Sequence, residues 1–171
     1  MPSLPHVIIH DDAPSAAFVR ASQAHDVPAL MACTTPDVVL RSPITGSFAF
    51  RGREQVAAVM EDVYAVLADA VYDGDVGDGR TRALRGTATI GGLEVHEIVL
   101  LELDHEGLVE SMEIFMRPMP ALLAVAAALG PRVAARNGRA RALATRMMIA
   151  PLAFATRHGE RVGSSLARPR P

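Results

Sequence analysis

The stretch that decides the fold runs from Thr81 to Arg117 and reads TRALRGTATIGGLEVHEIVLLELDHEGLVESMEIFMR. It contains three segments rich in β-branched and apolar residues, at Thr81–Ile90, Leu93–Leu103 and Leu108–Arg117. Turn-forming residues separate them, Gly91-Gly92 in the first gap and Asp104–Gly107 in the second, and such short connections join antiparallel neighbours. The sequence therefore predicts an antiparallel meander of three long strands.

Helical patterns precede these strands. Arg53–Ala68 is the clearest predicted helix, because Val56, Met60 and Val63 fall at three- and four-residue steps on one apolar stripe. The other predicted elements are helices at 14–24 and 29–33, a strand at 37–44, a loop at 45–52 and a turn at 73–79. This order favours an α+β fold, in which a curved antiparallel sheet wraps around the N-terminal and central helices.

The C-terminal part of the chain predicts shorter elements. Ala121–Leu129 indicates a helix that ends at Gly130-Pro131, and Ala140–Ala150 indicates another that is broken at Pro151. We expect disorder from Gly159 onward. The predicted organisation is an arm at 1–12, an α+β domain at 13–130 and an arginine-rich extension, helical or disordered, at 131–171.

Charge divides the chain in the same way. Residues 131–171 hold nine arginines and one acid, a net charge of +8, whereas residues 1–130 hold eight arginines and 18 acids, a net charge of −10. We expect a solvated tail rather than a nucleic-acid site, because no pattern of aromatic side chains for base stacking accompanies the arginines. The alternative is a tail that engages an acidic partner. No long apolar run predicts a membrane helix, and the first residues do not resemble a signal peptide, so we expect a cytoplasmic protein.

Three stretches resemble the SnoaL-like, nuclear-transport-factor-2-like superfamily: Phe18–Leu30, Val38–Val59 with SPITGSFAFRGREQV at its centre, and Val99–Pro118. The most specific features are a Phe-x-Gly ending at Gly52 before the long helix and the Asp104–Gly107 turn. The resemblance spans roughly residues 13–130 and implies a cystatin-like cone with a ligand pocket between sheet and helices. Its closest form is that of small actinobacterial proteins whose last strand also ends in Arg-Pro.

The resemblance allows the known chemistries of the superfamily to be tested by position. Ketosteroid isomerases use a tyrosine, a base and a protonated acid, and the matching positions here are Phe18, Ser42 and Val99. None of these side chains can perform those roles, so that chemistry is not expected. The epoxide hydrolases carry an Arg-x-Asp on a strand, but the matching stretch 82–87 holds no acid, and Glu113 has the wrong strand register.

Polyketide cyclases of the superfamily place an acid in the pocket, and alternation along the middle strand offers Glu97 for this position. Val95, Val99 and Leu101 share its predicted face, so desolvation would raise the pKa of Glu97 toward neutrality. Glu97 is therefore the predicted catalytic acid or base. The alternative is that Glu97 pairs with Arg85 or lies at the solvent-exposed end of the sheet.

The resemblance and the strand alternation together define a mostly apolar, methionine-bearing pocket. The predicted pocket-lining residues are Phe18, Leu40, Ser42, Met60, Tyr64, Val99, Leu101, Met112, Ile114 and Met116. We expect His25-Asp26 to cap a helix end and His96 to point away from the pocket. No cofactor is expected, and neither the Asp73–Asp78 run nor Glu94, His96 and Glu97 predicts a metal site.

These observations favour an enzyme of secondary metabolism that acts on an apolar polyketide- or terpenoid-like substrate by acid–base catalysis. The reaction type would be that of a cyclase, an isomerase or an epoxide hydrolase. The alternative is a non-catalytic protein of the same fold that binds a hydrophobic ligand or serves as an accessory subunit. The resemblance also implies a homodimer that forms through the outer face of the sheet.

Overall fold

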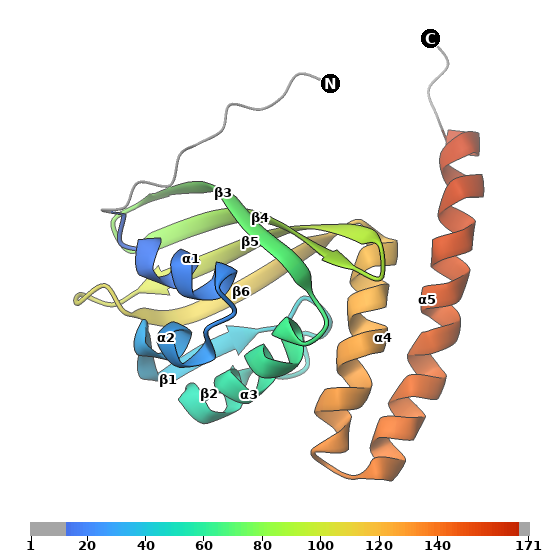
Figure 1. Ribbon diagram of the computed structural model, residues 1–171, viewed down its shortest axis with the longest axis horizontal. Helices are drawn as coiled ribbons and strands as arrows, with labels where there is room; N and C mark the ends of the chain where they lie inside the picture. Colours follow the sequence, from blue (N-terminus) through green and yellow to red (C-terminus); the bar gives the residue numbers. More distant parts are fainter. Residues whose placement is uncertain (1–12, 168–171) are drawn as a thin grey trace.

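A curved six-stranded sheet wraps around the helices of the N-terminal half, and a helical hairpin lies at one side (Figure 1). The computed structural model describes residues 13–167, with side chains up to residue 159. The elements in chain order are α1 (Ala16–Gln23), α2 (Val27–Ala32), β1 (Thr34–Arg41), β2 (Phe50–Arg51), α3 (Gly52–Tyr64), β3 (Ala68–Asp78), β4 (Thr81–Ile90), β5 (Leu93–Leu103), β6 (Val109–Arg117), α4 (Met119–Ala135) and α5 (Arg139–Ala167). The sheet order is β2-β1-β6-β5-β4-β3, and β1 and β6 run parallel while the other described pairs are antiparallel.

The predicted meander is confirmed. Strands β4 and β5 have the predicted bounds, and β6 begins one residue later than predicted. Buried and more exposed residues alternate along β4 and β5, as expected of strands with one face on the core. In this register Glu97 of β5 lies between Gly86 of β4 and Met116 of β6. The α+β fold class predicted from the sequence is therefore observed.

The predicted turn at 73–79 is wrong, because β3 continues through it to Asp78. The aspartates of this run make cross-strand ion pairs: Asp73 lies 2.7 Å from Arg85, and Asp75 lies 2.7 Å from Arg82. A glycine is required at position 77, where a Cβ atom would lie 2.0 Å from the carbonyl oxygen of Thr81. Residues that usually mark a turn thus build an edge strand.

The predictions for the C-terminal region are wrong in three places. Helix α4 continues through Gly130 and Pro131, so the predicted domain boundary at residue 130 falls inside a helix. Helix α5 likewise continues through Pro151 to Ala167, where disorder was predicted from Gly159. Packing explains the glycine, because a Cβ atom at position 130 would lie 3.0 Å from a Thr145 methyl group of α5. The predicted arm 1–12 and residues 168–171 lie outside the described part of the chain.

Two hydrophobic clusters form the core. The larger cluster joins α1, α2 and α3 to the strands, with Phe18, Leu40 and Met112 among its buried members. The smaller cluster packs α4 against β4 and β5 through residues such as Val95 and Val125. No helix within residues 13–167 is both long enough and apolar enough to cross a membrane.

Candidate functional site

A cavity of about 60 Å³ lies between the sheet and the helices, with walls from both hydrophobic clusters. The structure brings ten predicted site residues together around it: Phe18, Leu40, Ser42, Met60, Tyr64, Glu97, Val99, Met112, Ile114 and Met116. Leu101 is not among the lining residues. It shares the inner face of β5 but lies fully buried in the larger cluster, farther along the strand. The role of each residue at the cavity stays a prediction.

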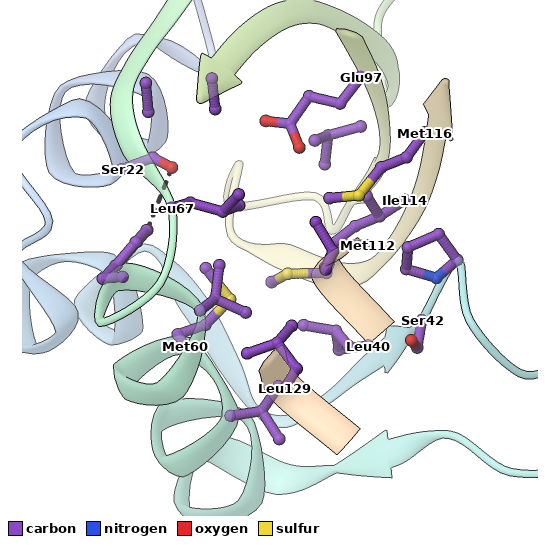
Figure 2. Close-up of a pocket in the computed structure, with 18 of the residues that line it drawn as sticks. Ser22, Leu40, Ser42, Met60, Leu67, Glu97, Met112, Ile114, Met116 and Leu129 are labelled. Atoms are coloured by element: carbon purple, nitrogen blue, oxygen red, sulfur yellow. Dashed lines mark hydrogen bonds between the residues drawn. The ribbon is translucent and has the colours of Figure 1, made fainter. Parts of the chain in front are cut away.

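Helix α4 closes one side of the cavity. Its residues Val125 and Leu129 line the space together with Val63 and Leu67, which follow the apolar stripe of the α3 region. Figure 2 shows Leu129 and Met60 facing the same space as the side chains of β6. The predicted helix at 121–129 therefore contributes to the site, although sequence reasoning did not include it there.

Glu97 is the carboxylic acid of this cavity. Its side chain points inward from β5 with only 8% of the residue exposed, and Figure 2 shows the carboxyl group directed into the space lined by Ile114 and Met116. The predicted alternative of an ion pair with Arg85 is not observed, because Arg85 pairs with Asp73 on β3. Instead, Oε1 of Glu97 accepts a hydrogen bond of 2.7 Å from the Tyr72 hydroxyl.

The surroundings of Glu97 favour its neutral form. Burial raises the pKa of the Glu97 carboxyl group, and the hydrogen bond from Tyr72 acts in the opposite direction by stabilising the carboxylate. No other hydrogen bond or ion pair to Glu97 is found in the described part of the chain. One oxygen of the carboxyl group, Oε2, thus has no protein partner there. A carboxyl group in this state can donate a proton as an acid or, once ionised, accept one as a base.

Tyr72 reaches Glu97 across a glycine. Tyr72 of β3, Gly86 of β4 and Glu97 of β5 lie side by side in the sheet register. A Cβ atom on Gly86 would lie only 2.9 Å from two ring carbons of Tyr72, so the ring passes over the place where a side chain would stand. The absence of a side chain at Gly86 therefore lets the Tyr72 hydroxyl contact a residue two strands away.

Two further hydroxyl groups extend this contact. The Tyr64 hydroxyl of α3 donates to Ser22 Oγ of α1 at 3.1 Å, and Ser22 donates to the Tyr72 hydroxyl at 3.5 Å. Burial raises the pKa of Tyr64 to about 12, and burial together with the nearby Glu97 raises that of Tyr72 well above its ordinary value. Both tyrosines therefore stay protonated, and the relay Tyr64–Ser22–Tyr72 donates toward Glu97.

His25 also lines the cavity. The expected capping role is confirmed, because the His25 and Asp26 amides donate to the Ser22 and Ala21 carbonyls at the end of α1. The Asp26 carboxylate also accepts from the Ala29 amide at the start of α2. Ser42 lies at the rim, where its Oγ accepts a hydrogen bond of 3.2 Å from the Ile44 amide.

Sequence reasoning missed both His25 and Tyr72 as site residues. The one available signal for Tyr72 was Gly86, a glycine inside a predicted strand, which is typical of close approach by another group. His96, predicted to point away, pairs with Glu94 at 3.3 Å on the outer face. Among the residues that the structure describes, no group of three or more His, Cys, Asp or Glu side chains is placed to hold a metal ion.

Comparisons with known proteins place this geometry in a family. The SnoaL-like domain family matches residues 16–111, which is more than half of the chain. No match was found among curated proteins. The chain is 28% identical to a solved protein with a cystatin-like fold from Silicibacter pomeroyi DSS-3, with a TM-score of 0.67 over 78% of this chain and 92% of that one.

Two enzymes are also similar in structure. The chain is 28% identical to a steroid delta-isomerase from Pseudomonas aeruginosa, with a TM-score of 0.66 over 79% of this chain and 98% of that one. It shares only the fold with the epoxide hydrolase/cyclase-like enzyme SalBIII, described for pyran ring formation in the polyether salinomycin, at 18% identity and a TM-score of 0.54 over 63% and 90% of the two chains. The chain therefore belongs to the SnoaL-like domain family.

Proposed function

We propose that this protein is an acid–base enzyme that moves a proton on a small apolar substrate, with Glu97 as the group that carries the proton. One observation supports this most strongly: a buried carboxyl group in an apolar cavity has a single hydrogen-bond donor, Tyr72, and one oxygen without a partner among the described residues. Such an oxygen is available to a substrate atom, and the raised pKa of Glu97 makes its carboxylate a stronger base.

The reaction class would be isomerisation, cyclisation or epoxide opening. In the first, the Glu97 carboxylate removes a proton from a carbon next to a carbonyl group and returns it elsewhere. In the other two, the protonated Glu97 donates to an oxygen as the ring closes or opens. The steroid delta-isomerase at 28% identity supports a reaction of the first kind. The residues would differ from those of ketosteroid isomerases, because Phe18, Ser42 and Val99 line the cavity without the required groups.

The cavity suggests a compact or adaptable binding site. A volume of about 60 Å³ is small beside the roughly 300–1,000 Å³ of typical ligand pockets. Met60, Met112 and Met116 line it, and unbranched thioether side chains can repack around a ligand. We propose that these methionines rearrange when an apolar substrate enters.

The alternative is a non-catalytic protein that binds a hydrophobic ligand. The observation in its favour is that Phe18, Ser42 and Val99 lack the functional groups that the best-known relatives use. The two functions differ in whether Glu97 exchanges protons with the ligand.

Exchange of the α-hydrogens of cyclohexanone in D₂O tests the proposal, because it needs proton abstraction alone and is followed by NMR. We expect the wild-type protein to accelerate exchange, Glu97→Gln to lose the acceleration, and Glu94→Gln to keep it. Glu94→Gln is the matched control, because it removes the same charge from the exposed face of the same strand. Undiminished exchange in Glu97→Gln would contradict the catalytic role. Binding of cyclohexanone without any exchange would support the alternative.

A further inference from the structure

His25 has an unusual environment in the short connection between α1 and α2. Its φ of 54° lies in the left-handed region, as expected of the residue that follows the C-cap of α1, where the His25 and Asp26 amides donate to the Ser22 and Ala21 carbonyls. Its imidazole ring stacks on the Tyr64 ring, with centroids 4.5 Å apart and planes 5° from parallel. The Tyr64 hydroxyl is itself bonded to Ser22, so the histidine ring stacks in the cavity wall on a hydrogen-bonded tyrosine.

The Nε2 atom of His25 is buried and has no hydrogen-bond partner among the described residues. Buried polar atoms in native proteins nearly always have a partner, so an exception in a cavity wall calls for an explanation. Both ring nitrogens of a histidine can form hydrogen bonds, either as donor or as acceptor, depending on the tautomer. A polar atom of a bound molecule would supply the partner that the described part of the chain does not.

We propose that His25 is a second polar ligand-binding residue, so that the cavity takes a compact apolar molecule with two oxygen functions, one at Glu97 and one at His25. This inference rests on the proposed function, because it assigns a second contact to the same ligand. A hydroxyl or a carbonyl oxygen suits His25, since the first can donate or accept and the second accepts from Nε2–H.

The Tyr64–Ser22–Tyr72 relay links the two proposed ligand contacts, His25 and Glu97. The His25 ring lies on Tyr64, and Tyr64 is the first member of the hydrogen-bonded series that ends at Glu97. The remaining lining is mostly apolar, with methionine, leucine and valine side chains. An oxygen placed against that lining would lose its hydrogen bonds to water without replacement. The cavity should therefore favour ligands whose two oxygens are spaced to contact both His25 and Glu97.

The experiment compares cyclohexanol with the 1,2-, 1,3- and 1,4-cyclohexanediols, which share one apolar ring and sample different spacings of two hydroxyls. We expect at least one diol to bind the wild-type protein about 2- to 10-fold more tightly than cyclohexanol, the range of one added hydrogen bond. In His25→Phe, which keeps a ring to stack on Tyr64, we expect the ratio of the affinity for the diol to the affinity for cyclohexanol to fall to about one. Titration with NMR detection measures both.

A second measurement avoids mutation. In the wild-type protein labelled with ¹⁵N in histidine, the Nε2 signal of His25 should shift on binding the preferred diol more than on binding cyclohexanol. If His25→Phe does not fold, His25→Asn replaces it, because asparagine tolerates a left-handed backbone and lacks the reach of the imidazole.

Three results would overturn the inference: no diol preferred over cyclohexanol, a preference that survives in the His25 variant, or no binding of any of the four probes. Its failure can be told apart from failure of the proposed function. A protein that exchanges the hydrogens of cyclohexanone but prefers no diol keeps the enzymatic function and loses the second contact. A protein that prefers a diol through His25 but exchanges nothing keeps the contact and loses the enzyme.

Discussion

Replacing Gly86 with alanine should break the hydrogen bond between Tyr72 and Glu97 without substituting either residue. The added methyl group would lie 2.9 Å from two ring carbons of Tyr72, whereas unstrained carbon contacts lie at roughly 3.5–4.0 Å. The ring must therefore retreat by roughly 0.6–1.1 Å, and the hydroxyl, farther from the pivot at Cβ, by roughly 1–2 Å. A hydrogen bond of 2.7 Å is then stretched or lost.

The consequence appears at Glu97. A hydrogen bond to a charged group contributes about 1.5–3 kcal/mol, and here it favours the carboxylate over the neutral acid. Gly86→Ala should therefore raise the pKa of Glu97 further above its ordinary value, in the direction in which burial already acts. Carbon-13 NMR of the Glu97 side-chain carboxyl, followed through a pH titration, measures this directly.

Two comparisons make the test specific. Tyr72→Phe removes the donor itself and should raise the pKa of Glu97 in the same sense. In the Tyr72→Phe background, Gly86→Ala should raise the pKa of Glu97 by less than it does in the wild-type protein, because the hydrogen bond that it disturbs is already gone. Gly46→Ala, where a Cβ atom meets nothing within 4 Å, is the matched control. An unchanged titration of Glu97 in Gly86→Ala would refute the reasoning.

Two further predictions concern stability and assembly. A native pKa of Glu97 above its unfolded value of about 4.5 means that the folded protein binds more protons there, so stability falls as pH rises from that value through the native pKa. Glu97→Gln should remove this fall and raise the free energy of unfolding at neutral pH, measured by urea unfolding at several pH values. An equal fall in the variant would contradict this prediction. We also propose a homodimer through the outer sheet face, where Ile98 and Phe115 are neighbours and both exposed. Phe115→Arg should yield monomers in sedimentation velocity, and an unchanged mass would exclude this face.

The sequence predicted the centre of the sheet because its signals there are local. Strict alternation along β5 places Glu97 and Val99 on one face, and turn residues end each strand, so side-chain direction follows from spacing alone. The inward direction of Glu97 was predictable for this reason.

Strand β3, the course of α4 through Gly130, and the presence of Tyr72 and His25 at the cavity depend on contacts between residues that are distant in sequence. The Asp73–Gly79 run consists largely of turn-forming residues. Ion pairs of Asp73 and Asp75 with arginines of β4 stabilise it as an edge strand instead. Gly130 is a residue type that commonly ends a helix. Here it lies inside α4, because the absence of a side chain lets α5 pack closely against it. Tyr72 and His25 join the site only because β3 and the α1–α2 connection are brought against it by packing, and no local pattern reports that.

Different elements provide the proposed reactive group of the site and part of its wall: Glu97 lies on the sheet, and helix α4 bounds the cavity. The match to the SnoaL-like family ends at residue 111, whereas Val125 and Leu129 close the cavity from a helix beyond it. The proposed proton carrier stands on the sheet, inside the residues that the family matches, while the volume available to a ligand is bounded in part by a helix outside them. Substitutions at Val125 and Leu129 would therefore change the size of molecule that the cavity accepts and leave Glu97 in place. The same division offers an engineer a place to widen the site without rebuilding its chemistry.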